Sequence, residues 1–396
     1  MTPGSRLTPG LLAALGFLAA VGPFATDMYL ASFTDIASDL GTTPSSVQLT
    51  LTAFLLGIGA GQLVLGPASD RFGRRPVLLW SLAVFALVGV VMVFSPHIAV
   101  LTALRVVQGF AGAAGVVVSR AIAVDLTDGA GAVRALSLIA TVVGLGPLIA
   151  PPIGGVVGAV WGWRGVLAVL AAISVGMLVL AWAAVPESLP ASQRAVGGFR
   201  EMPRRFGVLL AQRPFVTYVV VFAAAFGGMM AYISASPFVG QTVLGMGPVV
   251  YALGFSAGAA ALIVANLVNA RVAPRVGPPR MLLVGVGLAL TAGAALVLLA
   301  VTGVLAPWSF ILSAFALTAG SGLMMSNASA LALLRAGEAR GTGSALLGAA
   351  QFLAGGIVSP LVGAWGEHTA LPMAVIVLVA ATGALVAALV GRRLAP

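Results

Sequence analysis

The chain of 396 residues contains no cysteine and only two histidines, His97 and His368. The absence of cysteine excludes disulfides, thiolate metal sites and cysteine nucleophiles. Both histidines fall in expected loops, which argues against a histidine metal site and against a Ser-His-Asp triad. We therefore expect a protein that is not an enzyme and that has no metal site and no organic cofactor.

Charged side chains are also scarce, at 8% of the residues, whereas 60% of the residues are hydrophobic. A soluble domain carries roughly 25% charged residues, so this composition indicates a chain whose main solvent is lipid. The net charge of +10 comes entirely from arginine, since the sequence contains no lysine. These arginines sit in short loops between long apolar runs, which argues against nucleic acid as a partner.

Long apolar runs dominate the rest of the sequence. A membrane-spanning helix needs ~20 mostly apolar residues, and β-barrel strands, which are ~10 residues long and alternate in polarity, do not fit. Backbone groups in lipid must be bonded within the segment, so helices are expected. The first run, residues 11–30, is too long for the hydrophobic region of a signal peptide. The expected spans are residues 11–33, 47–67, 76–94, 98–120, 133–157, 165–185, 215–236, 249–270, 281–302, 307–333, 342–363 and 371–391.

These spans predict an all-α membrane protein with twelve transmembrane helices. The longest polar stretch, residues 186–213, separates the sixth span from the seventh and is expected to be a cytoplasmic linker. The expected domains are thus a six-helix bundle over residues 1–185 and a second six-helix bundle over residues 214–396.

The arginines also predict the orientation of the chain. Basic residues accumulate in cytoplasmic loops, and with Arg6 inside, 17 of the 20 arginines fall in inside loops. Arg164 is the arginine expected outside, while Arg105 and Arg120 fall within the fourth span. We therefore expect both termini in the cytoplasm, which requires an even number of spans.

The two halves resemble a diverged repeat. Arg71-Phe72-Gly73 follows the second span, and Arg275-Val276-Gly277 follows the eighth, at an offset of 204 residues. Equivalent positions in two six-span halves are evidence for a parallel repeat.

Asp27 is the clearest ionisable residue inside a span. Such residues are costly in a membrane and usually functional. Because desolvation disfavours a charged carboxylate, the group can bind and release a proton as its exposure changes. The alternative is that the first span ends sooner and Asp27 is a surface residue near Asp35 and Asp39. The offset of 204 places Ala231 at the matching position, so proton handling is expected in the first half.

Arg105 lies in the fourth span, with Gln108 about one turn further on the same face. It is either a buried cation that holds a carboxylate or a polar substrate group, or an interfacial arginine that snorkels outward.

Two segments rich in glycine carry further signals. Residues 144–155 in the fifth span contain three prolines, which bend a helix, and glycines that permit close helix approach. Plain helix packing explains the same pattern.

Residues 66–75 join the second and third spans, and there Asp70 is expected to accept from a neighbouring helix N-terminus. Asp125 is a possible partner for Arg74; the competing interpretation is a tight turn with cytoplasmic arginines.

Together these residues resemble the major facilitator superfamily. Residues 66–75 resemble its loop motif G-x-x-x-D-R-x-G-R-R, residues 105–109 its antiporter motif in span four, and residues 144–155 its exporter motif in span five. Residues 27–30 and 232–238 resemble the Bcr/CflA drug:H+ antiporter subfamily. One departure is Ala31, where that subfamily usually has proline.

The resemblance implies two six-helix bundles that operate by alternating access, with proton entry driving drug exit. The proton-coupling residues fall on Asp27 and Arg105. The substrate-binding residues fall on Asp27, Arg105, Gln108, Met229, Met230 and Tyr232, although the last three could instead face lipid or the core. The gating motif falls on Gly66, Asp70, Arg71, Gly73 and Arg74, together with Asp125. The antiporter helix carries Gly146, Pro147, Pro151, Pro152, Gly154 and Gly155.

The expected function is proton-coupled export of small lipophilic drugs, such as amphenicol-like antibiotics, from the cytoplasm across a bacterial inner membrane. The alternative is a major facilitator exporter of a native metabolite or sugar. The coupling ion is a proton, and the expected partners are a small-molecule drug and membrane lipid, with the chain acting as a monomer.

Overall fold

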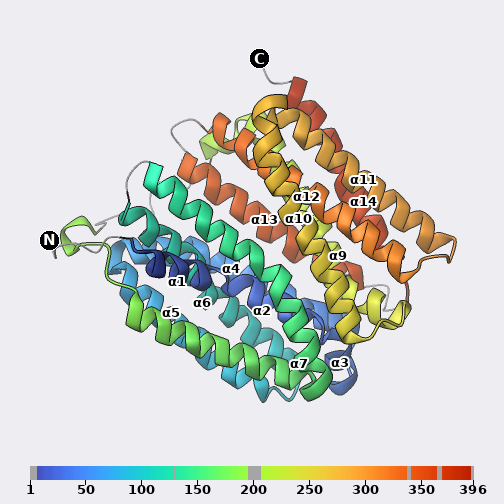
Figure 1. The fold of residues 1–396 in the computed structure, drawn as a ribbon, viewed down its shortest axis with the longest axis horizontal. Helices are drawn as coiled ribbons and strands as arrows, with labels where there is room; N and C mark the ends of the chain where they lie inside the picture. Colours follow the sequence, from blue (N-terminus) through green and yellow to red (C-terminus); the bar gives the residue numbers. More distant parts are fainter. Residues whose placement is uncertain (1–6, 128–129, 195–206, 337–339, 364–367, 394–396) are drawn as a thin grey trace. The chain divides into compact units, whose positions relative to one another are not determined.

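The computed structural model describes residues 7–127, 130–194, 207–336, 340–363 and 368–393, which form helices and no strand (Figure 1). Helices satisfy their own backbone hydrogen bonds, which lipid cannot do for them. Contacts divide the chain into unit 1, Met1–Asp35 with Ala53–Phe199, and unit 2, Ile36–Thr52 with Arg200–Pro396. The expected linker thus contains the boundary, and residues 36–52 group with the second half.

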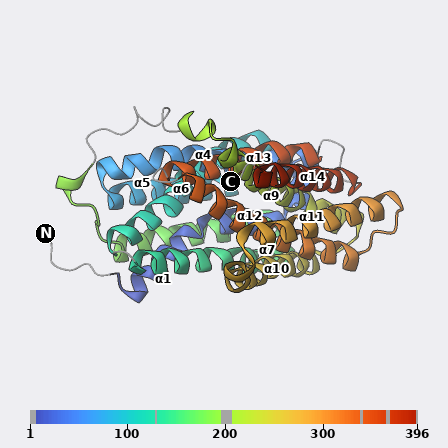
Figure 2. The same ribbon diagram turned by 90° about the horizontal axis from the view of Figure 1, so that it is seen from above.

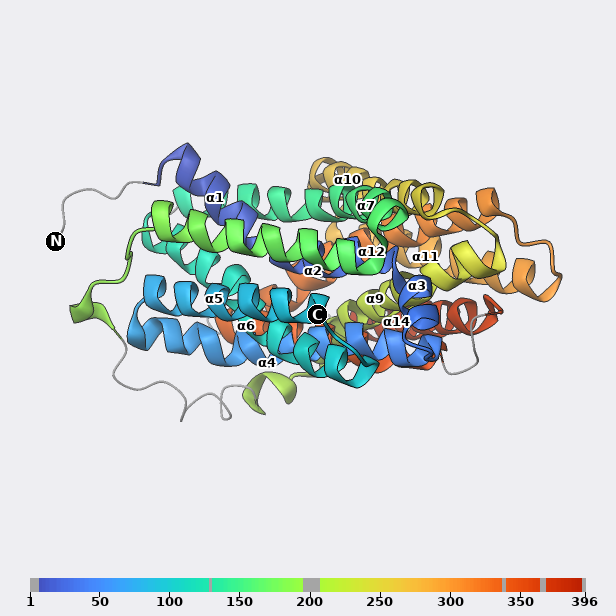
Figure 3. The ribbon, with the colours of Figure 1, turned by 90° about the horizontal axis from the view of Figure 1, so that it is seen from below.

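Unit 1 is built around the longest helix, α7. Within this unit α7 packs against α1, α2 and α5, and α5 also packs against α6 (Figures 1 and 3). The elements up to the linker are α1 (Pro9–Ala19), α2 (Val21–Leu30), α3 (Phe33–Asp39), α4 (Pro44–Phe72), α5 (Arg74–Val93), α6 (Ile98–Asp125), α7 (Ala130–Ala184) and the 3₁₀ turn η1 (Ala191–Gln193).

In unit 2, α12 packs against α9, α10 and α11 (Figure 2). The beginning of α4 also belongs to this unit, where Gln48 Nε2 donates to the Ser234 carbonyl at 3.0 Å. The elements after the linker are α9 (Arg213–Pro237), the π-turn η2 (Phe238–Val243), α10 (Pro248–Val276), α11 (Pro278–Val301), α12 (Pro307–Arg335), α13 (Arg340–Gly363) and α14 (Leu371–Arg393).

The described residues account for twelve spans. Ten helices are individually long and apolar enough to cross a membrane, and α1 with α2 makes an eleventh span that is bent by 45°. The segment Thr141–Ala184 of α7 has 44 residues, which is about 66 Å of helix, or twice the ~30 Å of a hydrocarbon core. It contains two spans, which meet at Gly162 (φ 66°, ψ −175°). The predicted twelve-helix fold is confirmed.

Glycine allows the backbones of α4 and α6 to approach closely. A Cβ atom on Gly57 would collide with the Val106 carbonyl oxygen, and one on Gly61 would collide with the Phe110 carbonyl oxygen. A Cβ atom on Gly109 of α6 would meet the α4 backbone in the same way. Small residues are the usual means of tight helix packing in lipid, where no hydrophobic effect drives association.

The expected repeat is visible in the backbone. Gly73 stands between α4 and α5 with φ 101° and ψ 151°, and Gly277 stands between α10 and α11 with φ 91° and ψ 139°. These are the two Arg-x-Gly positions that lie 204 residues apart. The same turn, in a conformation that glycine adopts easily, therefore joins equivalent helices in the two halves.

Candidate functional site

Asp27 lies inside the protein and not at its surface. It is 5% exposed, and its Oδ1 accepts a hydrogen bond from the Thr26 hydroxyl at 2.9 Å. That hydroxyl also lies 3.0 Å from the Gly22 carbonyl oxygen, so its proton is shared. Among the described residues, no ion pair involves Asp27. Asp27 is therefore a buried carboxyl group to which the described residues offer a hydroxyl donor and no cationic partner.

The helix that carries Asp27 is short because the first span is broken. α1 ends at Ala19 and α2 starts at Val21, with Ala20 between them and a bend of 45°. The Ala20 N–H still bonds carbonyls in the last turn of α1. Asp27 therefore sits on a ten-residue helix whose direction differs from that of the helix before it.

The glycine-rich first half of α7 packs directly on this short helix. A Cβ atom on Gly146 would lie 2.5 Å from Pro23 Cβ, and one on Gly154 would collide with the Met28 carbonyl oxygen. Gly155 beside it is buried. Gly146 and Gly154 therefore contact α2 at Pro23 and Met28, and Asp27 lies between these two contacts along the helix. Three prolines, Pro147, Pro151 and Pro152, lie within α7, where only Gly162 has non-helical backbone angles.

Arg105 of α6 is completely buried, which excludes the snorkelling alternative. Its Nη1 donates to the Ala25 carbonyl of α2 at 2.9 Å and to Gln108 Oε1 at 2.8 Å. Its Cζ lies 4.8 Å from the centre of the Tyr29 ring and 4.3 Å from that of Phe54, an arrangement in which aromatic faces stabilise a cation. Arg105 thus binds the helix that carries Asp27.

Several hydrogen-bond donors of Arg105 and Gln108 have no acceptor among the described residues. In the described part of the chain, Arg105 Nε and Nη2 and Gln108 Nε2 are buried and unpaired. Buried polar groups are normally hydrogen-bonded, so such exceptions need an explanation. These three donors can serve an acceptor group on a bound molecule or on water.

The loop motif between α4 and α5 forms an ionic cluster around Arg74. Arg74 Nη1 donates to Ser69 Oγ at 2.8 Å and to Asp70 Oδ1, and its Nε donates to Asp125 Oδ2 at 2.9 Å. The Ser188 hydroxyl donates to the same Asp125 oxygen. The pairing of Arg74 with Asp125 is the one expected from the sequence, and it ties the end of α6 to the start of α5.

The carboxylate at the N-terminus of α5 differs from the expected one. Glu187, just after α7, accepts from the backbone N–H of Arg74 at 3.0 Å and of Arg75 at 3.3 Å. Asp70 instead binds the Arg74 side chain. Gly73 makes room for this contact, because a Cβ atom there would lie 2.5 Å from Glu187 Oε2. The sequence signal is an acid directly after the sixth expected span, within the segment predicted only as a linker.

The remaining residues of the gating motif lie at its edges. Arg71 is exposed, with its Cζ 5.3 Å from the centre of the Phe72 ring. A Cβ atom on Gly66 would lie 3.3 Å from Val117 Cγ1 of α6.

The substrate-binding candidates of the second half belong to unit 2. Met229 is partly exposed and Met230 is buried. Tyr232 is also buried, and its ring stacks on Phe255 at 5.8 Å between centres and lies 5.9 Å from Phe310. Tyr232, Phe255 and Phe310 thus form an aromatic cluster between α9, α10 and α12. Asp27, Arg105 and Gln108 instead belong to unit 1.

Residues suited to hold a metal are not gathered anywhere in the described ranges. No group of three or more histidine, cysteine, aspartate or glutamate side chains with suitable geometry occurs there.

Comparison with known proteins identifies the family. The sequence profile of the Major Facilitator Superfamily matches residues 15–360. The chain is 36% identical to the uncharacterized MFS-type transporter YdgK of Bacillus subtilis, over 94% of this chain and 91% of that one. It is 33% identical to the bicyclomycin resistance protein homolog of Haemophilus influenzae, over 93% and 90%. It is 31% identical to a chloramphenicol resistance protein of Pseudomonas aeruginosa, over 70% and 64%.

Solved structures share the fold. A bacterial homolog of the human lysosomal transporter Spinster superposes with a TM-score of 0.76 at 17% identity, covering 99% of both chains. The nucleoside transporter NupG superposes with a TM-score of 0.77 at 13% identity, covering 98% of this chain and 99% of that one. The profile, the relatives and the twelve-span fold agree with the motifs, and the chain belongs to the major facilitator superfamily of membrane transporters.

Proposed function

We propose that this transporter exports small lipophilic drugs, amphenicol-like or other antibiotics, in exchange for protons by alternating access. The observation that carries the proposal is that Asp27 is buried and has no cationic partner among the residues that the structure describes. The names of the bicyclomycin- and chloramphenicol-resistance relatives support the class of substrate.

In the proposed cycle Asp27 takes a proton when the site opens to the outside and releases it when the site opens to the cytoplasm. A ligand shifts a conformational equilibrium only by its difference in affinity for the two states. Exchange of one proton for a neutral drug moves one charge, which is worth ~2.3 kcal/mol for each 100 mV of membrane potential. The proton is then the coupling ion, and no other cofactor is required.

Arg105 and Gln108 are proposed to bind the drug or an intervening water. Their three unpaired donors favour a substrate with carbonyl, nitro or hydroxyl oxygens. A buried donor without a hydrogen bond raises the free energy of the protein, and an oxygen of this kind would supply the missing acceptor. Tyr232, Met229 and Met230 are proposed to contribute apolar contacts, for which flexible methionine side chains are suited.

The Arg74 cluster is proposed to act as the gate. Asp70, Asp125 and Ser69 converge on one guanidinium, so a change in the spacing of α4, α5 and α6 breaks several bonds at once. The proposed location is a bacterial inner membrane, with both termini in the cytoplasm and the chain acting as a monomer.

The test is transport in proteoliposomes. Asp27→Asn keeps the size of the side chain but cannot exchange a proton, so it is expected to abolish chloramphenicol-driven proton release. Asp35→Asn is the matched control, since Asp35 is an exposed acid in α3 outside the spans, and it should keep full coupling. Retained coupling in Asp27→Asn would remove this residue from the mechanism.

The substrate class needs a separate test. A drug-sensitive bacterium that expresses the chain is expected to tolerate higher concentrations of amphenicols, and the Asp27→Asn variant should lose that protection. Unchanged sensitivity to a broad antibiotic panel, with intact proton coupling to another solute, would favour export of a native metabolite or sugar instead.

A further inference from the structure

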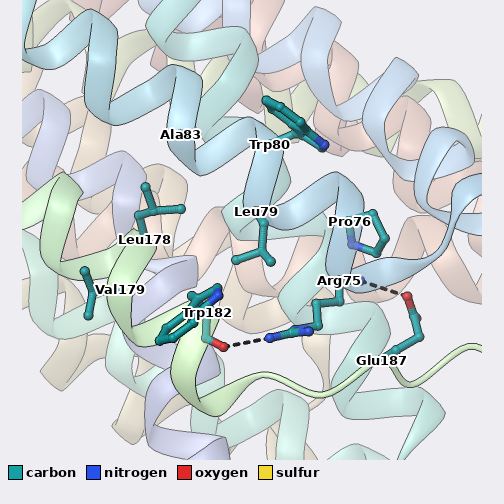
Figure 4. Close-up of a pocket in the computed structure, with 9 residues that line it drawn as sticks. All are labelled: Arg75, Pro76, Leu79, Trp80, Ala83, Leu178, Val179, Trp182 and Glu187. Carbon is teal, nitrogen blue, oxygen red and sulfur yellow. Dashed lines mark hydrogen bonds between the residues drawn. The ribbon is translucent and has the colours of Figure 1, made fainter.

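An open groove lies on the surface of unit 1, between α5 and the second half of α7 (Figure 4). Its volume is about 660 Å³, within the range of sites that hold small ligands. The groove is separate from the proposed proton and drug site, since Asp27, Arg105 and Gln108 are not among its lining residues.

The lining changes from polar to apolar along the groove. On α5 the lining residues Arg75, Leu79 and Ala83 follow one another at every fourth position, so they form one stripe. On α7 Trp182 stands near the last turn, and Leu178 lies one turn further in. The stripe from Arg75 to Ala83 is about 12 Å long, close to the ~15 Å half-thickness of a hydrocarbon core.

The polar end of the groove carries an arginine with spare donors. Arg75 Nη2 donates to the Trp182 carbonyl at 2.8 Å, while Nε is buried and has no acceptor among the described residues. Glu187 does not neutralise this guanidinium through a hydrogen bond, because its oxygens accept from the backbone of Arg74, Arg75 and Leu189. Glu187 also lies 3.8 Å from Arg194. The Arg75 guanidinium therefore has no carboxylate hydrogen-bond partner in the described part of the chain.

Two tryptophans flank the groove, Trp80 at 76% exposure and Trp182 at 66%. In Figure 4 they come from the two facing helices. Tryptophan is enriched where the hydrocarbon core meets the headgroups. The polar end of the groove therefore lies at headgroup depth, and the leucine and valine side chains lie deeper.

We propose that this groove binds an anionic phospholipid, with its phosphate at Arg75 and an acyl chain between Leu79 and Leu178. Basic pockets between spans bind anionic headgroups in this way. An apolar groove of similar size in unit 2 provides a contrast: it is lined by residues of α9 and α14 such as Val220, Thr217 and Val386, and it has no charged residue. Its uncharged lining offers nothing that would select one headgroup over another.

The test uses tryptophan fluorescence of the full chain in phosphatidylcholine vesicles. One variant keeps Trp182 and replaces the other five tryptophans by phenylalanine, and a matched variant keeps only Trp308, which is 72% exposed in unit 2. Brominated phosphatidylglycerol or brominated phosphatidylcholine is added at equal mole fraction as the quencher. We expect Trp182 to show about a fivefold preference for the anionic lipid, which corresponds to about 1 kcal/mol per arginine. Trp308 should show none.

Two substitutions separate charge from shape. Arg75→Gln should remove the preference at Trp182, while Arg75→Lys keeps the charge and should retain it even though the bond to the Trp182 carbonyl is altered. The proposal is overturned if both lipids quench Trp182 equally, or if the preference survives Arg75→Gln or is lost in Arg75→Lys. It is also overturned if neither lipid quenches Trp182, because another protein surface would then cover the groove.

Discussion

At the scale of single residues, Asp27 belongs to α2 and Arg105 of α6 contacts that helix, yet this acid and this cation do not form an ion pair. Arg105 binds a backbone carbonyl, an amide and two aromatic rings instead. A carboxylate paired to that guanidinium would keep its negative charge. The proposed proton exchange at Asp27 requires the carboxyl group to be unpaired in this way, which its separation from Arg105 provides.

Gly154 is the residue where packing beside Asp27 is tightest. We expect Gly154→Ala to lower the stability of the protein by about 1–3 kcal/mol, because the new Cβ atom collides with the Met28 carbonyl and overpacks the contact between α7 and α2. Thermal unfolding in detergent, together with drug transport, measures the effect.

The control for this substitution is Gly144→Ala in the same helix, where a Cβ atom would meet nothing within 4 Å. It should leave both stability and transport near those of the parent. Equal stability of the two alanine variants would contradict the tight contact between α7 and α2.

At the scale of elements, the turn at Gly73 combines an unusual backbone with an ionic contact. Glu187 holds the N-terminus of α5 through two backbone donors, a position where a carboxylate is worth ~0.3–1 kcal/mol or more when partly buried. This contact links the segment after the sixth span to the start of the third.

Gly73→Ala and Gly277→Ala form a matched pair that isolates this contact. Both variants lose about 1–3 kcal/mol of stability, because alanine is placed in a backbone conformation that only glycine adopts easily. Gly73→Ala also pushes Glu187 away. Gly277→Ala meets no such contact, since the nearest atom to its Cβ would be Pro279 Cδ at 3.7 Å. We expect the first variant to unfold at a lower temperature than the second. Equal unfolding temperatures would show that Glu187 adds no stability.

The elements were largely predictable from the sequence, whereas their partners were not. Lipid solvent demands apolar runs of one length, so the twelve spans follow from hydropathy, and Gly73 with Gly277 marks the repeat. The sequence did not predict that α4 continues through Asp70 to Phe72, or that Glu187 and not Asp70 receives the N–H groups of α5. Those outcomes depend on which helix ends meet in space, and sequence spacing does not encode that.

At the scale of the whole molecule, arginine placement predicts the orientation in the membrane. Because the chain has no native cysteine, single cysteines report accessibility without background. Ser192→Cys, in the exposed part of the linker, is expected to resist an impermeant maleimide in intact cells, whereas Ser38→Cys in α3 should react. Both should react in permeabilised cells. The reverse pattern, or two sites labelled from the same side, would overturn the predicted topology.

The break at Ala20 gives α2 a direction of its own, with Asp27 in the last turn of that ten-residue helix. Asp27 lies seven residues beyond Ala20, about 10 Å along the axis at ~1.5 Å per residue. A swing of only about 10° around Ala20 would carry the carboxyl group through roughly 2 Å, enough to break one hydrogen bond and form another. We expect such a rotation to move the acid without moving α1, and to carry along the Arg105 bond to the Ala25 carbonyl and the Gly154 contact with Met28.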